Sequence, residues 1–127
     1  MVPSNSLTLT HLIAAPRIAP PPGKRPPLLI LLHGVGSNEH DLFGLAELLD
    51  ERFFIVSARS PLTLGPGSYG WYPVYFTPQG AVGDTKLAEE GRVKLIQFIT
   101  EVTAEYNADP ARVYLMGFSQ GAIMSLF

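Results

Sequence analysis

The stretch that decides the fold is Val-Tyr-Leu-Met-Gly-Phe-Ser-Gln-Gly-Ala-Ile-Met, residues 113–124. An apolar strand runs directly into a Gly-x-Ser-x-Gly turn, and an apolar helical pattern follows it. The pentapeptide alone is a short motif that also arises by chance, but this strand–turn–helix setting is what a nucleophile elbow requires. We therefore expect Ser119 to adopt a strained backbone conformation, with its hydroxyl raised above the sheet edge at the N-terminus of a helix.

Three short apolar runs recur along the chain, at Leu28 to Leu32, Phe53 to Ser57 and Val113 to Gly117. Each run is continuous rather than alternating, which is typical of strands covered on both faces in a parallel sheet. Helical patterns separate the runs, so right-handed βαβ crossovers are expected. The sequence therefore predicts an α/β fold of three layers around a mostly parallel sheet.

The two helical patterns differ in length. The shorter one places Leu42, Leu45, Ala46 and Leu49 on one face, with Ser37 or Asn38 as its N-cap. The longer one spans about Thr85 to Tyr106 and ends at Asn107, Asp109 and Pro110. We expect its apolar face to consist of Leu95, Ile96, Ile99, Val102, Thr103 and Tyr106, and its polar face to hold Glu90, Lys94, Gln97, Glu101 and Glu105.

Three further segments frame these elements. Leu7 to Ile13 alternates imperfectly and predicts an antiparallel edge strand. Pro16 to Pro27 contains six prolines in twelve residues, so we interpret it as a stiff surface connection rather than a proline-motif docking site. Gly65 to Gly83 is rich in glycine, proline and aromatic residues, and two interpretations stay open. It is a binding loop or lid, or a loop packed down by its own rings.

A second chemical signal is His33-Gly34-Val35-Gly36-Ser37-Asn38, directly after the first apolar run. Glycines here let backbone N–H groups face a cavity, and a hydrolase needs two such donors for the oxyanion of a tetrahedral intermediate. One donor would be the residue after the nucleophile, Gln120, and the other Val35. A dinucleotide-binding loop is excluded because Glu39 stands where the third glycine would be, and no Walker lysine follows.

Residues 31–42, Leu-Leu-His-Gly-Val-Gly-Ser-Asn-Glu-His-Asp-Leu, resemble the oxyanion-loop segment of the phospholipase/carboxylesterase family of α/β-hydrolases, which is related to acyl-protein thioesterases. Residues 109–121, Asp-Pro-Ala-Arg-Val-Tyr-Leu-Met-Gly-Phe-Ser-Gln-Gly, resemble its nucleophile segment, and Gly70-Trp71-Tyr72 resembles its aromatic pocket motif. The resemblance covers nearly all of the chain from Pro27 onward. It implies a cofactor-free and metal-free hydrolase of carboxylic esters and thioesters. Ser119 is then the nucleophile, Val35 and Gln120 are the oxyanion donors, and Trp71 contributes to the acyl or alcohol pocket.

Composition narrows the partners. The 127 residues carry a net charge of −2 and no basic run, which argues against a nucleic-acid partner, and the longest apolar run is too short to span a bilayer. The absence of cysteine excludes a thiol nucleophile, and Met1 to Thr10 shows no secretory signal, so we expect a cytoplasmic protein. A small ester is the expected partner, and a homodimer stays open.

The sequence lacks the groups that would activate the serine. In this fold an Asp or Glu and then a His follow the nucleophile, yet Gln120 to Phe127 contains neither. We expect His33 to brace the oxyanion loop rather than to act as the base, with His11 on an edge strand and His40 in the first turn of a helix. The chain is therefore interpreted as the N-terminal part of one α/β-hydrolase domain, 1–127. A C-terminal segment would supply the acid and the base. A truncated, non-catalytic hydrolase-like module is the alternative.

Overall fold

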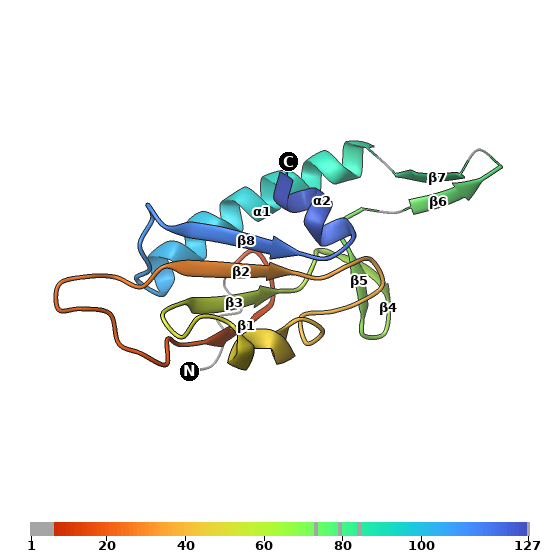
Figure 1. Ribbon diagram of the computed structural model, residues 1–127. Helices are drawn as coiled ribbons and strands as arrows, with labels where there is room; N and C mark the ends of the chain where they lie inside the picture. Colours follow the sequence, from red (N-terminus) through yellow and green to blue (C-terminus); the bar gives the residue numbers. More distant parts are fainter. Residues whose placement is uncertain (1–6, 73, 79, 84, 127) are drawn as a thin grey trace.

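The computed structural model describes residues 7–72, 74–78, 80–83 and 85–126, and its centre is a four-stranded sheet in the order β1-β3-β2-β8 (Figure 1). Strand β2 (Leu28–Leu32) pairs in parallel with β3 (Phe54–Ala58) and with β8 (Val113–Gly117), whereas β1 (His11–Ala14) pairs antiparallel with β3. The mostly parallel sheet and the antiparallel edge strand are both confirmed. Strands β2 and β8 have the predicted bounds, β3 lies one residue later, and β1 is shorter than expected.

Burial explains why the apolar runs become the inner strands. Every residue of β2 and β3 is buried. A larger core cluster lies on the α1 side and includes Ile30 and Val56, and a smaller cluster lies on the opposite side and includes Leu31 and Ile55. Strand β8 differs, because its Tyr114 is 50% exposed and its outer edge pairs with no strand in the described part of the chain. The prediction of cover on both faces is therefore right for β2 and β3 and wrong for β8.

Helix α1 (Thr85–Glu105) matches the predicted long helix and packs on the larger cluster. Its apolar face is rotated from the predicted one. Phe98, which the prediction left out, is fully buried, whereas Ile96 is 49% exposed. The reason is that the buried positions follow an alternating spacing of three and four, at Ala88, Gly91, Leu95, Phe98 and Val102.

The end of α1 lies where the sequence predicts it. Asn107 has a positive φ of 52°, and the N–H of Ala108 donates to the carbonyl of Thr103 over 3.0 Å. This is the hydrogen-bond pattern of a left-handed helix C-terminus, in which asparagine is a common substitute for glycine.

The predicted first helix needs correction. It is a short 3₁₀-helix, η1 (Phe43–Leu48), and its N-cap residue is Leu42, without a side-chain cap. Ser37 instead forms a β-bridge with Tyr69, and Asn38 accepts a hydrogen bond from the His40 amide over 2.9 Å. His40 therefore lies in a turn before the helix. Three of the four residues predicted for the apolar face are confirmed, since Ala46 is buried and Leu42 and Leu49 pack beside it.

The glycine-rich segment is not an irregular loop. It forms two antiparallel hairpins, β4 (Leu62–Gly65) with β5 (Ser68–Gly70) and β6 (Val74–Thr77) with β7 (Gly80–Gly83). Between the hairpins, Trp71 and Tyr72 are buried in the larger cluster, which supports a segment packed down by its rings. The side chains of Tyr75 and Phe76 lie outside what the structure describes, as do residues 1–6 of the region searched for a signal.

The remaining connections agree with the sequence. No helix or strand forms between Pro16 and Pro27, and the arginine within it, Arg17, donates to the carbonyls of Glu47 and Leu49. Among the helices that the structure describes, none has the length and apolarity needed to cross a membrane.

Candidate active site

The turn after β8 has the geometry that the sequence predicts. Ser119 is exposed and has a φ of +56°, a left-handed conformation that is rare for residues with a side chain. Helix α2 (Gln120–Leu126) begins at the next residue. The N–H of Phe118 donates to the carbonyl of Leu32 over 3.1 Å, which ties the turn to the end of β2. Ser119 is thus held at the carboxyl edge of the sheet.

Two glycines permit this close approach. A Cβ on Gly121 would lie 2.0 Å from the carbonyl oxygen of Leu32, so no other residue fits there without a shift of the backbone. A Cβ on Gly34 would lie 3.2 Å from the Cβ of Ser119. The structure therefore places the His33–Asn38 loop, which the sequence singled out, directly against the serine turn.

The two backbone amides expected to bind the oxyanion are those of Val35 and Gln120. Neither amide donates a hydrogen bond to any residue within the described ranges, although the neighbouring Gly36 amide donates to the Tyr69 carbonyl over 2.8 Å. The two residues also approach a common point. A Cβ on Gly70 would lie 3.4 Å from Cγ2 of Val35 and 3.5 Å from Oε1 of Gln120. Both amides are thus without a hydrogen-bond partner within the described ranges.

His33 is buried, and both of its ring nitrogens have partners. Nε2 lies 3.0 Å from the backbone nitrogen of Ser60, which can only donate, so Nε2 is the acceptor. Nδ1 therefore carries the proton and donates to the carbonyl of Gly34 over 2.8 Å. Burial lowers the pKa of His33 below 6.5 and favours this neutral form. The ring braces the loop and does not hydrogen-bond to Ser119.

Neither of the other histidines forms a hydrogen bond with Ser119 among the described contacts. His11 is buried, with Nδ1 bonded to the Leu9 carbonyl, Nε2 bonded to the Tyr106 hydroxyl and its ring edge-on to Phe98. His40 is exposed in its turn. The Ser119 hydroxyl itself has no hydrogen-bond partner among the residues whose contacts are described.

Sequence reasoning missed a part-buried ion pair next to the His33–Asn38 loop. Glu39 is only 3% exposed, and its carboxylate accepts two hydrogen bonds from Arg59 at 2.9 and 2.6 Å. Arg59 also lies over the Tyr69 ring, 4.4 Å from its centroid. Burial opposes ionisation of Glu39, but the hydrogen bonds and charge of Arg59 outweigh it and lower the pKa of Glu39. Glu39 and Arg59 lie 20 positions apart in the sequence, and they meet only because Arg59 directly follows β3, the strand that pairs with β2. No local sequence pattern could therefore predict this ion pair.

The side chain of Gln120 is a second feature that the sequence did not reveal. It is buried, its Oε1 accepts from the Trp71 amide over 2.7 Å, and its Nε2 donates to the Tyr72 carbonyl over 2.8 Å. These bonds join the serine turn to the aromatic segment, which lies 48 and 49 positions earlier.

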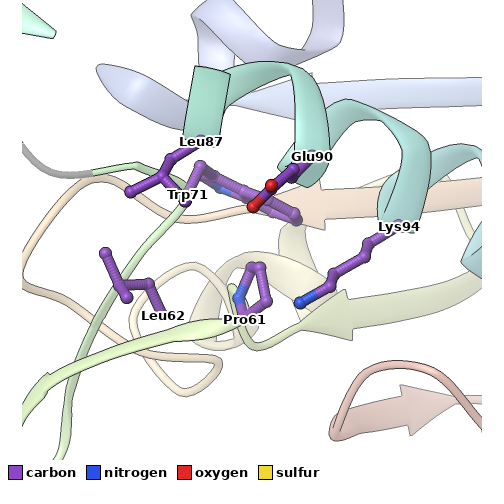
Figure 2. A pocket seen from close by; sticks show the side chains of 7 residues that line it. Pro61, Leu62, Trp71, Leu87, Glu90 and Lys94 are labelled. Atoms are coloured by element: carbon purple, nitrogen blue, oxygen red, sulfur yellow. The ribbon is translucent and has the colours of Figure 1, made fainter. Parts of the chain in front are cut away.

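The ring of Trp71 faces a different space from Ser119. It is 1% exposed and lines a cavity of about 70 Å³ between α1 and the start of β4, together with Pro61, Leu62, Leu87, Glu90, Gly91 and Lys94 (Figure 2). Neither Ser119 nor Val35 lines this cavity. The indole N–H of Trp71 has no hydrogen-bond partner among the described residues. Trp71 therefore reaches the serine turn through its backbone.

No described group of three His, Cys, Asp or Glu side chains is arranged to hold a metal ion. The exposed hydroxyl of Ser119 lies in a turn that the glycine loop contacts, and a serine hydroxyl beside backbone N–H groups suits attack on a carbonyl carbon.

Several known proteins are similar to this chain in sequence or in fold. A protein of Bacillus subtilis (strain 168), named "Putative hydrolase MhqD", is 31% identical over 97 residues, covering 75% of this chain and 46% of that protein. The crystal structure of the Bacillus cereus carboxylesterase is 28% identical, with a TM-score of 0.75 over 94% of this chain and 52% of that one. A carboxylesterase from Mesorhizobium loti, 20% identical, shares the fold with a TM-score of 0.76, over 95% of this chain and 54% of its own.

The chain thus spans about half the length of the relatives that it matches. The family described as Phospholipase/Carboxylesterase matches residues 13–127, which include the strands, the serine turn and the glycine loop. On this match and on the α/β-hydrolase fold of its sheet, the chain belongs to the phospholipase/carboxylesterase family.

Proposed function

We propose that this chain is the nucleophile-bearing, N-terminal part of one serine esterase domain, which cleaves carboxylic esters and, as a second substrate class, thioesters. The observation that carries the proposal is the left-handed φ of an exposed Ser119, directly beside a loop whose Val35 amide is unpaired within the described residues. Strain of this kind on a non-glycine residue persists where the surrounding structure enforces it, and it clusters at active sites.

In the proposed reaction, Ser119 Oγ forms a bond to the substrate carbonyl carbon while its proton passes to a base. The carbonyl oxygen becomes an anion and accepts hydrogen bonds from the amides of Val35 and Gln120. Collapse of this intermediate breaks the C–O or C–S bond, and the departing alcohol or thiol takes up the proton from the base. Water then hydrolyses the acyl-enzyme by the same route, so no cofactor is required.

The proton acceptor is proposed to lie outside this chain. The nitrogens of His11 and His33 are occupied by structural hydrogen bonds, and the fold orders its triad as serine, acid and histidine. The relatives are about twice as long as the chain, and we assign the acid and the histidine to that remaining length.

The substrate is proposed to be small and apolar near its carbonyl. Phe118 precedes Ser119, and Val35 follows Gly34, whose Cβ position would lie 3.2 Å from the Cβ of Ser119. Val35 and Phe118 are apolar, and they are 43% and 66% exposed. Exposed apolar groups beside a reactive hydroxyl favour contact with acyl or alkyl groups rather than with charged ones. Trp71 is proposed to shape the pocket from behind, through its fixed backbone.

The alternative is a hydrolase-like module without catalysis, and one experiment separates the two. The full-length protein is treated with a fluorophosphonate probe and assayed with a p-nitrophenyl acyl ester. We expect one label, on Ser119, and a loss of turnover of roughly 10⁴- to 10⁶-fold in Ser119→Ala. Ser68→Ala should keep the label. Absence of labelling in the wild type, or a label on another serine, would contradict the proposal.

A further inference from the structure

Hydrogen bonds connect the aromatic segment Tyr69–Tyr72 both to the loop that carries Val35 and to the turn that carries Gln120, the two proposed oxyanion donors. On one side, Tyr69 accepts from the Gly36 amide and donates to the Ser37 carbonyl, both over 2.8 Å. On the other side, Trp71 and Tyr72 bond to the side chain of Gln120. One short piece of backbone therefore spans the oxyanion loop and the serine turn.

From this geometry we propose that the side chain of Gln120 is a positioning residue. It anchors the serine turn to the segment Tyr69–Tyr72, and it thereby fixes the Gln120 amide relative to the Val35 amide. This role rests on the proposed function of the Ser119 site and adds to it, because it assigns work to the side chain and not only to the backbone N–H.

The chemistry of the contact selects glutamine. Its carbonyl oxygen accepts from one backbone N–H and its amide nitrogen donates to one backbone carbonyl, as a neighbouring strand would. A reversed amide would place oxygen against the Tyr72 carbonyl and NH₂ against the Trp71 N–H, so a single orientation is stable. Because Gln120 is 3% exposed, loss of either bond would leave a buried polar group unpaired.

The anchor point is rigid. The Trp71 ring is packed in the core, and α1 presses on its backbone, since a Cβ on Gly91 would lie 3.0 Å from the Trp71 carbonyl oxygen. The same Cβ would lie 3.6 Å from Met124 Cε, so α2 reaches this contact as well. Gln120 is thus tied to a fixed part of the core rather than to a surface loop.

Fixing the amide matters because an oxyanion hole works when its donors are held in place before charge develops. The residue before Gln120 is strained, and strain is relieved unless neighbouring contacts oppose it. The side-chain anchor opposes rotation of the turn at the residue that bears the donor. Misplacement of a catalytic group by about 1 Å can cost roughly 100-fold in rate.

The test uses the full-length protein with Gln120→Met, which keeps the length and removes both hydrogen bonds. Gln97→Met makes the same change on the exposed face of α1 and is the matched control. Rates are normalised to active sites titrated with the fluorophosphonate. For Gln120→Met we expect kcat to fall roughly 10- to 100-fold while KM changes less than about threefold. The control should match the wild type.

Gln120→Glu provides a rescue that a purely structural role would not show. When protonated, its carboxyl offers a C=O to the Trp71 amide and an O–H to the Tyr72 carbonyl, whereas the ionised form opposes the latter. The ratio of mutant to wild-type kcat should therefore rise as pH falls, and the ratio cancels the titration of the shared base. A ratio that does not change with pH would count against the anchor.

A readout independent of hydrolysis is the ¹⁹F resonance of 5-fluorotryptophan at Trp71, assigned with Trp71→Phe. The chemical shift of this resonance should change in Gln120→Met and should remain that of the wild type in Gln97→Met. The inference is overturned if Gln120→Met keeps kcat per titrated site within about threefold of the wild type, even with lowered stability. An unlabelled, inactive wild type would overturn the proposed function, and with it this catalytic role, whatever the resonance shows.

Discussion

The glycine loop after β2 and the serine turn after β8 end neighbouring parallel strands, with Leu32 paired to Gly117, yet close packing constrains the turn far more tightly than the loop. The loop is held by polar contacts, with His33 bonded to Gly34 and Ser60. The turn has the hydrogen bonds of the Gln120 side chain and, in addition, a steric constraint, because Gly121 leaves no space for a side chain. The comparison teaches that a backbone amide can be positioned by hydrogen bonds, which tolerate a similar side chain, or by steric contact, which does not.

Gly121→Ala should have the largest effect. A new Cβ at 2.0 Å from the Leu32 carbonyl must push the turn off β2, and we expect a loss of more than about 4 kcal/mol in the free energy of unfolding. Helix propensity alone predicts the opposite, a gain of about 1 kcal/mol in α2. Denaturant unfolding of the full-length protein measures the difference. Gly44→Ala, where nothing lies within 4 Å of the added Cβ, should change stability by no more than about 1 kcal/mol. Equal losses of stability in Gly121→Ala and Gly44→Ala would contradict the steric explanation for the serine turn.

Val35→Pro tests the loop as a donor. Proline removes the backbone N–H, and loss of one oxyanion donor lowers kcat by roughly 10²- to 10³-fold. Val35→Ala keeps the N–H, and we expect its kcat to stay within a few-fold of the wild type. Ester hydrolysis per titrated active site measures both. A proline variant as active as the alanine variant would remove Val35 from the oxyanion hole.

His33→Ala tests the polar brace. It leaves the Ser60 amide and the Gly34 carbonyl without their partner, so we expect a loss of about 1–3 kcal/mol in unfolding free energy. His33→Gln can still donate and accept, and should lose less. Neither change should move the pH optimum of kcat, because a brace does not transfer the proton. An unperturbed fold with complete loss of activity would instead make His33 the base.

The pH dependence of stability should show the smallest effect. His33 has its pKa lowered below 6.5 by burial, so the folded state favours the neutral ring and the unfolded state binds more protons below that pH. The contribution of the neutral His33 ring to the free energy of unfolding is fully present above pH 6.5, and it is lost as pH falls through the lowered pKa of the folded state. Glu39, with a pKa below 4.5, acts in the same direction in a more acidic range. The difference in the free energy of unfolding between wild type and His33→Gln should become smaller as pH falls below 6.5. Parallel curves would exclude a neutral, buried His33.

Prediction from sequence succeeded where the signal was local. The bounds of β2, β8 and α1, and the strained backbone at Ser119, follow from apolar runs, helical spacing and flanking glycines. It failed where the partner is distant. The Ser37 and Asn38 side chains looked like helix caps, but Ser37 pairs with Tyr69 and the Asn38 side-chain amide donates to the carbonyl of Gly67. The Gly65–Gly83 segment gave no strand period, because its hairpins are short and interrupted by glycine.

What the sequence by itself determined is the order of the core strands β2, β3 and β8 and of the long helix α1 along the chain, and the place of the serine, because these depend on side-chain period and on where glycine permits a turn. The tertiary structure alone decided what holds the site. Gln120 bonds to Trp71 and Tyr72, His33 to Ser60, and Glu39 to Arg59, at separations of 20 to 49 residues. Such pairs have no local signature, since a buried polar group is satisfied by whatever partner the packed sheet brings within hydrogen-bonding distance.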